Sequence, residues 1–139
     1  MYTAQPPFPS NRQMPHRPRV LIVDDSPVAL SFLRAVFQST YDVDTAVDGA
    51  DAMQKALAQA PDLVVTDSLM PNVDGFELIA RLREHPPTAS IPIVMLTSSD
   101  AGDEEIRSRT PQPDSIVRKS TSIEPLLQEV ARLLISKHN

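Results

Sequence analysis

Apolar runs alternate with amphipathic segments along most of this chain, and that alternation restricts its fold more than any other feature. Residues 20–23, 63–66 and 91–96 are nearly continuous apolar runs, typical of strands buried on both faces of a sheet. Residues 41–47 alternate polar with apolar side chains, as an outer strand does, and residues 115–118 form a short fifth candidate. The intervening segments have helical spacing. This order predicts an α/β fold, a doubly wound five-stranded parallel sheet with helices on both faces.

Capping residues stand where most of the predicted helices would begin. Their side-chain oxygens can accept hydrogen bonds from the free N–H groups of a first helical turn. These residues are Ser26, Asp48, Asp74 and Ser122. In the first predicted helix, four apolar residues follow at helical spacing: Phe32, Leu33, Val36 and Phe37. The stretch 100–113 is less regular, and we expect one short helix over 103–109 before Pro111 and Pro113 force an irregular connection.

Residues 1–18 differ in composition from the rest of the chain. They contain five prolines and no apolar periodicity, which predicts a disordered, partly polyproline-like tail ahead of a folded domain over residues 19–139. Residues 1–19 hold three arginines and no acidic residue, which leaves ten basic and eighteen acidic residues, a net charge of −8, for residues 20–139. Such an acidic domain argues against direct nucleic-acid binding and suits a metal ion or a basic partner.

The chain contains no cysteine, which excludes disulfides and thiolate metal sites and fits a reducing compartment. No apolar run approaches the ~20 residues of a membrane span, and the N-terminal residues lack the apolar core of a signal peptide. We therefore expect a cytoplasmic protein without a membrane partner.

Polar residues with possible chemical roles come directly after the predicted strands. They are Asp24 and Asp25 after the first strand, Asp67 after the third, Thr97 and Ser98 after the fourth, and Lys119 after the fifth. Ligands of doubly wound sheets bind at the carboxyl ends of the strands, where the strand order reverses. Each residue alone has an ordinary explanation as a cap, a turn or a solvated charge. Their coincidence at one edge of the sheet is what indicates a site.

Three of these residues are carboxylates, which repel one another and raise each other's pKa when they are packed together. A cation would relieve the repulsion, and oxygen ligands without histidine or cysteine suit Mg²⁺ or Mn²⁺ rather than Zn²⁺. Asp25 and Asp67 are the best candidates for direct ligands. The backbone carbonyl of Leu69 could complete the protein's share, and Asp24 could act through a metal-bound water. The pattern therefore predicts a magnesium-class site.

Together these motifs resemble the response-regulator receiver domains of two-component systems, including the single-domain receivers of the chemotaxis type. The resemblance covers residues 19 to about 136. It rests on VLIVDDS at 20–26, DSLMP at 67–71, DG at 74–75, MLTS at 95–98 and Lys119. Each motif is weak alone, but the spacings between them also agree with the family. They are 42 residues from Asp25 to Asp67, 30 from Asp67 to Thr97 and 22 from Thr97 to Lys119. The resemblance implies a flavodoxin-like receiver fold.

The family's chemistry is carried over residue by residue as an implication of this resemblance. Asp67 would accept a phosphoryl group from a sensor histidine kinase or a histidine phosphotransfer protein. Thr97 would hydrogen-bond a phosphoryl oxygen, and Lys119 and the metal would neutralise the phosphoryl charge. That bond would draw the following loop inward, with Ser98 as an auxiliary residue, and so signal to a downstream partner of unknown identity. The chain would be a signalling phosphoacceptor rather than an enzyme.

Several positions depart from the family pattern. Ser120 stands where proline usually follows the lysine, and Ile116 occupies the usual position of an aromatic switch residue. Residues 111–113, Pro-Gln-Pro, replace a small turn that usually contains glycine, so the usual output face is in doubt. Leu69 and Ser99 stand where polar side chains can orient the hydrolytic water, which predicts slow loss of the phosphoryl group.

Two other functions agree with parts of the pattern. A phosphatase of the haloacid dehalogenase type also uses a strand-end aspartate and magnesium, but it needs a second aspartate where this chain has Leu69. A pseudo-receiver would act through protein contacts without being phosphorylated. The acidic triad, Thr97 and Lys119 argue against a pseudo-receiver, whereas the departures from the family pattern leave it open. No Gly-x-x-x-x-Gly-Lys run exists, which excludes a P-loop nucleotide hydrolase.

Overall fold

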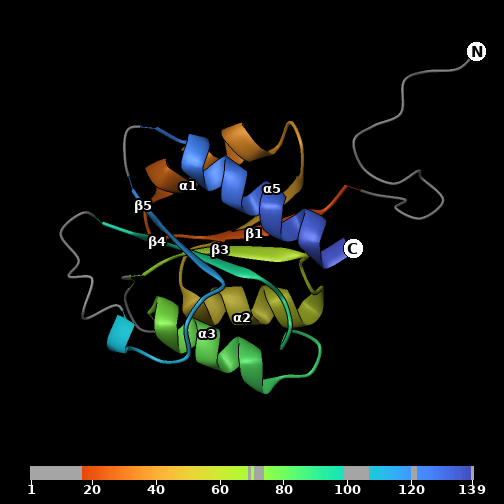
Figure 1. Ribbon diagram of the computed structural model, residues 1–139, viewed down its shortest axis with the longest axis vertical. Coiled ribbons are helices and arrows are strands. Elements are labelled where there is room, and N and C mark those ends of the chain that lie inside the picture. The colour runs from red at the N-terminus through yellow and green to blue at the C-terminus, as the bar shows by residue number, and fades with distance from the viewer. Residues whose placement is uncertain (1–16, 69, 71–73, 99–106, 120–121, 139) are drawn as a thin grey trace, which may run out of the picture.

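Five parallel strands form the centre of the computed structural model, which describes residues 17–68, 70, 74–98, 107–119 and 122–138 (Figure 1). The strands are β1 (Arg19–Val23), β2 (Asp42–Ala46), β3 (Leu63–Asp67), β4 (Ile93–Thr97) and β5 (Ser115–Arg118). The helices are α1 (Pro27–Phe37), α2 (Gly49–Ala58), α3 (Gly75–Glu84) and α5 (Glu124–His138). The strand order is β2-β1-β3-β4-β5, so the chain leaves β1 first toward one side of the sheet and later toward the other.

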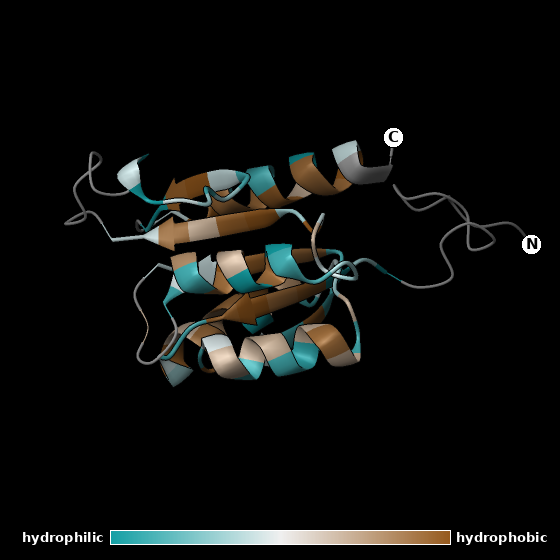
Figure 2. Cartoon of the chain, turned by 90° about the horizontal axis from the view of Figure 1, so that it is seen from below, coloured by the Kyte–Doolittle hydropathy of each residue, from teal (hydrophilic) through white to brown (hydrophobic). Residues whose placement is uncertain are grey.

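Helices cover both faces of the sheet, with α1 and α5 on one side and α2 and α3 on the other (Figure 1). The core is divided in the same way because side chains alternate along each strand. Val20 and Ile22 of β1 pack with the α1 and α5 cluster, whereas Leu21 and Val23 pack with the α2 and α3 cluster. Figure 2 shows the strands as mainly hydrophobic and the helices as mixed, which matches a sheet buried on both faces.

Local hydrogen bonds confirm the predicted helix starts. The side chains of Ser26, Asp48 and Asp74 accept bonds from the N–H groups of residues three positions on, at 3.2, 2.8 and 2.9 Å. At α5, the N–H of Glu124 donates to the hydroxyl of Ser122 at 3.4 Å. Among the described residues, no helix is both long enough and apolar enough to span a membrane.

Phe32 does not share the buried face of α1, although helical spacing groups it with the other apolar residues of that helix. Leu33 and Phe37 are buried one turn apart and set the direction of the inner face of α1, and Val36 packs partly against the same cluster. Successive helical residues point about 100° apart, so Phe32 lies at the margin of the face centred on Leu33, and it is 55% exposed. The four apolar residues at helical spacing therefore span a wider surface than the sheet covers.

Residues 17 and 18 already contact the folded domain. The guanidinium of Arg17 donates to the backbone carbonyls of Gln38, Thr40 and Tyr41, just past α1. Pro18 is buried, and its carbonyl accepts a bond from the N–H of Asp42 at 3.0 Å. Residues 1–16 lie outside the described ranges, so the tail over residues 1–18 stays a prediction. Most of the helix predicted over 103–109 also lies outside them, although residues 107–108 are helical.

Candidate functional site

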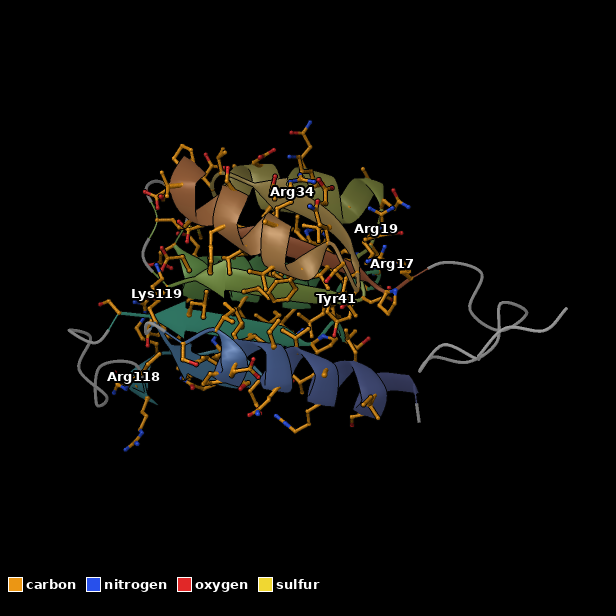
Figure 3. All side chains as sticks on the ribbon, turned by 90° about the horizontal axis from the view of Figure 1, so that it is seen from above. Arg17, Arg19, Arg34, Tyr41, Arg118 and Lys119 are labelled. Carbon is orange, nitrogen blue, oxygen red and sulfur yellow. The ribbon has the colours of Figure 1, made fainter. Side chains whose placement is uncertain are left out.

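The strand ends bring the predicted polar residues to one edge of the sheet. Asp24 follows β1, Asp67 ends β3, Thr97 ends β4, and Lys119 follows β5. Because the strands are parallel, these four residues lie at their carboxyl ends, beside the point where the strand order reverses. In Figure 3, Lys119 lies at this edge, whereas Arg17 and Tyr41 lie at the opposite edge.

Three carboxylates form a compact acidic cluster at this edge. Asp24, Asp25 and Asp67 can each offer an oxygen such that all three oxygens lie within 4.8 Å of one another. Asp24 is 2% exposed and Asp67 is 8% exposed, whereas Asp25 faces solvent. A set of three carboxylate oxygens with one open side fits a hard divalent cation such as Mg²⁺. Leu69, whose carbonyl was predicted to join this set, lies outside the described residues.

Lys119 supplies positive charge to the cluster from β5. Its ammonium Nζ lies 3.2 Å from Oδ2 of Asp67 and 3.7 Å from Oδ2 of Asp24. Its backbone N–H donates to the carbonyl of Thr97 at 2.7 Å, which fixes the start of this segment against the end of β4. The lysine side chain remains 40% exposed, so its charge is partly hydrated.

Burial dominates the electrostatics of Asp24. Loss of hydration raises the pKa of its carboxyl, and the nearby charges of Asp67 and Asp25 raise it further. A hydrogen bond from the N–H of Ser26 at 2.9 Å and the charge of Lys119 oppose this rise. The net pKa is raised, so ionisation of Asp24 is less favourable in the folded protein than in the unfolded chain, and a bound cation would favour the ionised form.

Thr97 presents a buried hydroxyl that lacks a partner. Its Oγ1 makes no hydrogen bond within the described part of the chain, although the residue is fully buried. An unpaired buried hydroxyl typically costs about 1–3 kcal/mol, so such groups are uncommon without a functional reason. The hydroxyl could bond a ligand that arrives at the end of β4.

The two auxiliary residues, Ser98 and Ile116, lie on or next to the strands that carry the site. Ser98 directly follows β4 and is partly buried. Ile116 lies in β5 opposite Met95 in the register and is 38% exposed. Their roles in switching stay predictions, and Ser99 and Ser120 lie outside the described residues.

An apolar cavity of about 190 Å³ adjoins the acidic cluster. Phe32 and Leu33 of α1, Val117 of β5 and Leu126 of α5 line it, together with the site residues Asp24 and Lys119. The sequence did not reveal this cavity, because helical spacing alone does not separate Phe32, which lines the cavity, from the buried residues of α1.

The fold and the site define a class of α/β domain that gathers carboxylates, a hydroxyl and a lysine at the carboxyl edge of a parallel sheet. Residues 20–131 match the sequence model of the family described as the response regulator receiver domain. The chain therefore belongs to the response regulator receiver domains of two-component systems, and the predicted fold, family and receiver function are confirmed. This family consists of signalling domains rather than conventional enzymes, and nothing found supports the two rival functions.

Curated relatives carry such a domain within longer proteins. The DNA-binding dual master transcriptional regulator RpaA of Synechocystis is 38% identical over 119 residues, which cover 84% of this chain and 49% of that protein. Hybrid signal transduction histidine kinase D of Dictyostelium discoideum is 34% identical over 132 residues, 94% of this chain and 8% of that protein. This chain thus spans half or less of the length of these two relatives.

Solved structures agree with this assignment. The response regulator TrrA from Thermotoga maritima, in complex with Mg²⁺ and BeF, is 30% identical with a TM-score of 0.74, and the match covers 84% of this chain and 98% of that one. A receiver domain of a histidine kinase from Syntrophus aciditrophicus gives a TM-score of 0.78 at 30% identity, covering 86% and 91% of the two chains. Receiver domains bind Mg²⁺ at an acidic cluster of the kind formed by Asp24, Asp25 and Asp67.

Proposed function

We propose that Asp67 accepts a phosphoryl group from the phosphohistidine of a sensor histidine kinase or a histidine phosphotransfer protein. The observation that carries this proposal is the position of its carboxylate. Asp67 is 8% exposed, ends β3 within the acidic cluster, and has the ammonium of Lys119 at 3.2 Å. An ionised carboxylate held beside positive charge can attack phosphorus.

The transfer replaces one bond to phosphorus with another. A carboxylate oxygen of Asp67 attacks the phosphorus, the bond from phosphorus to the imidazole nitrogen breaks, and that nitrogen keeps the electron pair. Lys119 neutralises charge on the phosphoryl oxygens, and the unpartnered hydroxyl of Thr97 donates a hydrogen bond to one of them. The new bond to Thr97 would then shift the segment that follows β4.

Mg²⁺ or Mn²⁺ is the cofactor that we propose for this site. Asp25 and Asp67 would bind it directly, Asp24 would act through a bound water, and the carbonyl of Leu69 is a further candidate from the sequence. The bound cation would stabilise negative charge on the phosphoryl oxygens. The complex of TrrA with Mg²⁺ and BeF supports a magnesium-class cation for this chain.

The histidine-bearing partner has a surface beside the site on which to dock. Val28 and Phe32 of α1 are 79% and 55% exposed, and Phe32 lines the apolar cavity that Lys119 also lines. A donor histidine must come within bonding distance of Asp67, and we propose that the donor protein then covers this part of α1, which shares the cavity with Asp24 and Lys119. We therefore propose that an apolar side chain of the donor enters the cavity.

Other parts of the proposal rest on the sequence. The downstream partner is a protein of unknown identity, and residues 20–139 are too acidic to favour contact with nucleic acid. A chain without cysteine suits the cytoplasm, and residues 1–18 form a proline-rich tail ahead of the receiver domain. Leu69 has no polar group to orient a hydrolytic water, so autodephosphorylation is slow.

Intact mass after incubation with acetyl phosphate and Mg²⁺ tests the proposed function. We expect an increase of one phosphoryl group that disappears in Asp67→Asn and requires the metal. A label that persists in Asp67→Asn would place the acceptor elsewhere. Absence of label with several donors would favour a pseudo-receiver that acts through protein contacts alone.

A further inference from the structure

Gly75, the first residue of α3, lies against the backbone of Asp67. A Cβ atom built on this glycine would stand 2.5 Å from the carbonyl oxygen of Asp67 and 3.1 Å from Cα of Ser68. Both distances are shorter than ordinary van der Waals contact, and both involve backbone atoms that cannot rotate away. It would also stand 3.0 Å from Cε of Met95, a flexible side chain that could move.

Backbone conformation does not explain this glycine. Among the described residues, no glycine has a positive φ, so an L side chain could adopt the conformation of Gly75 without strain. The missing side chain is instead what allows α3 to approach the end of β3. The contact is reinforced by a hydrogen bond, because the N–H of Gly75 donates to the carbonyl of Ser68 at 3.1 Å.

The backbone of Asp67 has little room to retreat. Its carbonyl, the group that faces Gly75, also accepts a bond from the hydroxyl of Thr66 at 3.0 Å. The N–H of Ser68 donates to the carbonyl of Leu96 in β4 at 3.0 Å. A methyl group at position 75 would therefore either displace this peptide or push α3 away, and the first outcome would move the carboxylate of Asp67.

We propose that Gly75 is a positioning residue for Asp67, and this inference rests on the proposed function of Asp67 as the phosphoacceptor. Because Gly75 has no side chain, the start of α3 can contact the Asp67 carbonyl. This contact sets the position of the Asp67 carboxylate relative to Asp24, Asp25 and Lys119. A displacement of about 1 Å at a reacting group can lower a rate by about 100-fold.

Gly75→Ala tests the inference, with Gly49→Ala as its matched control. Both glycines are the first helical residue after an aspartate cap, Asp74 for α3 and Asp48 for α2. With acetyl phosphate at saturating Mg²⁺, we expect labelling of Gly75→Ala to slow by about 10-fold or more, and Gly49→Ala to be labelled like the wild type. Equal labelling of Gly75→Ala and the wild type would overturn the inference.

Two further measurements separate positioning from a general loss of packing. Amide NMR should show Mg²⁺ binding weakened by several-fold in Gly75→Ala but not in Gly49→Ala. The double variant Gly75→Ala/Met95→Leu should stay slow, because the backbone contact with Asp67 remains. If shortening Met95 restores the rate, the clash lies with that side chain and the inference is wrong.

Failure of the proposed function is distinguishable from failure of this inference. If the wild type is not labelled at all, the phosphoacceptor role fails, and the Mg²⁺ titrations still decide whether Gly75 positions Asp67. If Gly75→Ala does not fold, the wild type alone supplies the test. In the wild type, the NMR signal of the Gly75 amide should shift during Mg²⁺ titration with the same midpoint as the signal of the Asp67 amide. A Gly75 amide signal that does not shift would overturn the inference.

Discussion

The ammonium of Lys119 lies 3.2 Å from the carboxylate of Asp67, although 52 residues separate them in the sequence. Lys119 takes this position because its N–H is bonded to the carbonyl of Thr97, which holds the residue after β5 beside the end of β4. The ammonium of Lys119 thereby lies beside two of the carboxylates that would bind a metal ion, Asp24 and Asp67, and neutralises part of their negative charge. It can compete with a cation before phosphorylation and assist the phosphoryl group afterwards.

Replacing Lys119 should separate these two effects. In Lys119→Met we expect labelling by acetyl phosphate to fall by about 100-fold, the size of effect seen when one charge-stabilising donor is removed. Mg²⁺ should bind up to about fivefold more tightly, because a partly exposed ion pair contributes at most ~1 kcal/mol of competition. Mass spectrometry and NMR titration measure the two quantities. Weaker Mg²⁺ binding in Lys119→Met would contradict the competition, and Lys55→Met controls for loss of a lysine elsewhere.

Asp25 should be essential for the metal but not for the fold. It is exposed, so Asp25→Ala removes a carboxylate without leaving a buried cavity. We expect Mg²⁺ affinity to fall by at least about 10-fold, equivalent to 1.4 kcal/mol, while the thermal midpoint without metal changes little. Isothermal titration calorimetry with Mg²⁺ is the measurement. Unchanged affinity would show that the cation binds through other residues.

Asp24→Asn should stabilise the metal-free fold. Because burial raises the pKa of Asp24, its folded state holds the proton more tightly than the unfolded state does. Stability therefore falls as pH rises from about 3.9, the usual value for aspartate, through the raised pKa. Asparagine keeps the acceptor for the N–H of Ser26 and removes the charge.

For Asp24→Asn in EDTA at pH 7, we expect a thermal midpoint higher by about 4 °C, or ~1 kcal/mol. The difference from the wild type should shrink as pH falls below the raised pKa, where Asp24 is protonated. Calorimetric scans from pH 4 to 7 in EDTA check both points. A lower midpoint for Asp24→Asn at neutral pH would mean that Lys119 compensates the buried charge fully.

The parts of this structure that follow from local sequence could be predicted. Strands were evident from apolar runs, and helix starts from the oxygens of Ser26, Asp48 and Asp74, because both signals involve residues a few positions apart. The acidic cluster was predictable as well, since parallel strands place their carboxyl ends at one edge whatever their register. Neither inference required knowledge of how side chains pack.

Features that depend on packing between elements could not be read in this way. The exposure of Phe32 depends on how α1 is rotated over the sheet, and spacing alone does not give that rotation. The contact between Gly75 and Asp67 depends on how closely α3 approaches β3. The sequence shows the Asp74-Gly75 pair as a helix start, which is also what Asp48-Gly49 shows, and the close approach of Gly75 to the Asp67 carbonyl is evident only in the structure.

Leu69→Asn should speed the loss of the phosphoryl group from Asp67. The argument rests on chemistry, because leucine cannot hydrogen-bond a water whereas asparagine can orient one for attack in line with the leaving oxygen. We expect decay about 10-fold faster in Leu69→Asn, a change of 1.4 kcal/mol in the barrier. Mass spectra taken over time after donor removal, at one Mg²⁺ concentration, give both rates. Equal rates would show that Lys119 and the metal control hydrolysis without help from residue 69.

Phe32→Ala should impair phosphotransfer from a protein donor while sparing transfer from a small one. Phe32 lines the apolar cavity next to the site. In the proposed docking mode, a phosphorylated histidine protein covers this part of α1, whereas acetyl phosphate need not touch it. We expect a loss of about 10-fold or more in transfer from the histidine protein, because a buried aromatic contact at an interface is commonly worth at least ~1.4 kcal/mol. Ile135→Ala is the matched control, since Ile135 is 60% exposed near the far end of α5. A comparable loss with acetyl phosphate would mean that Phe32 supports the site itself. An equal loss in Ile135→Ala would mean that the donor does not dock specifically on α1.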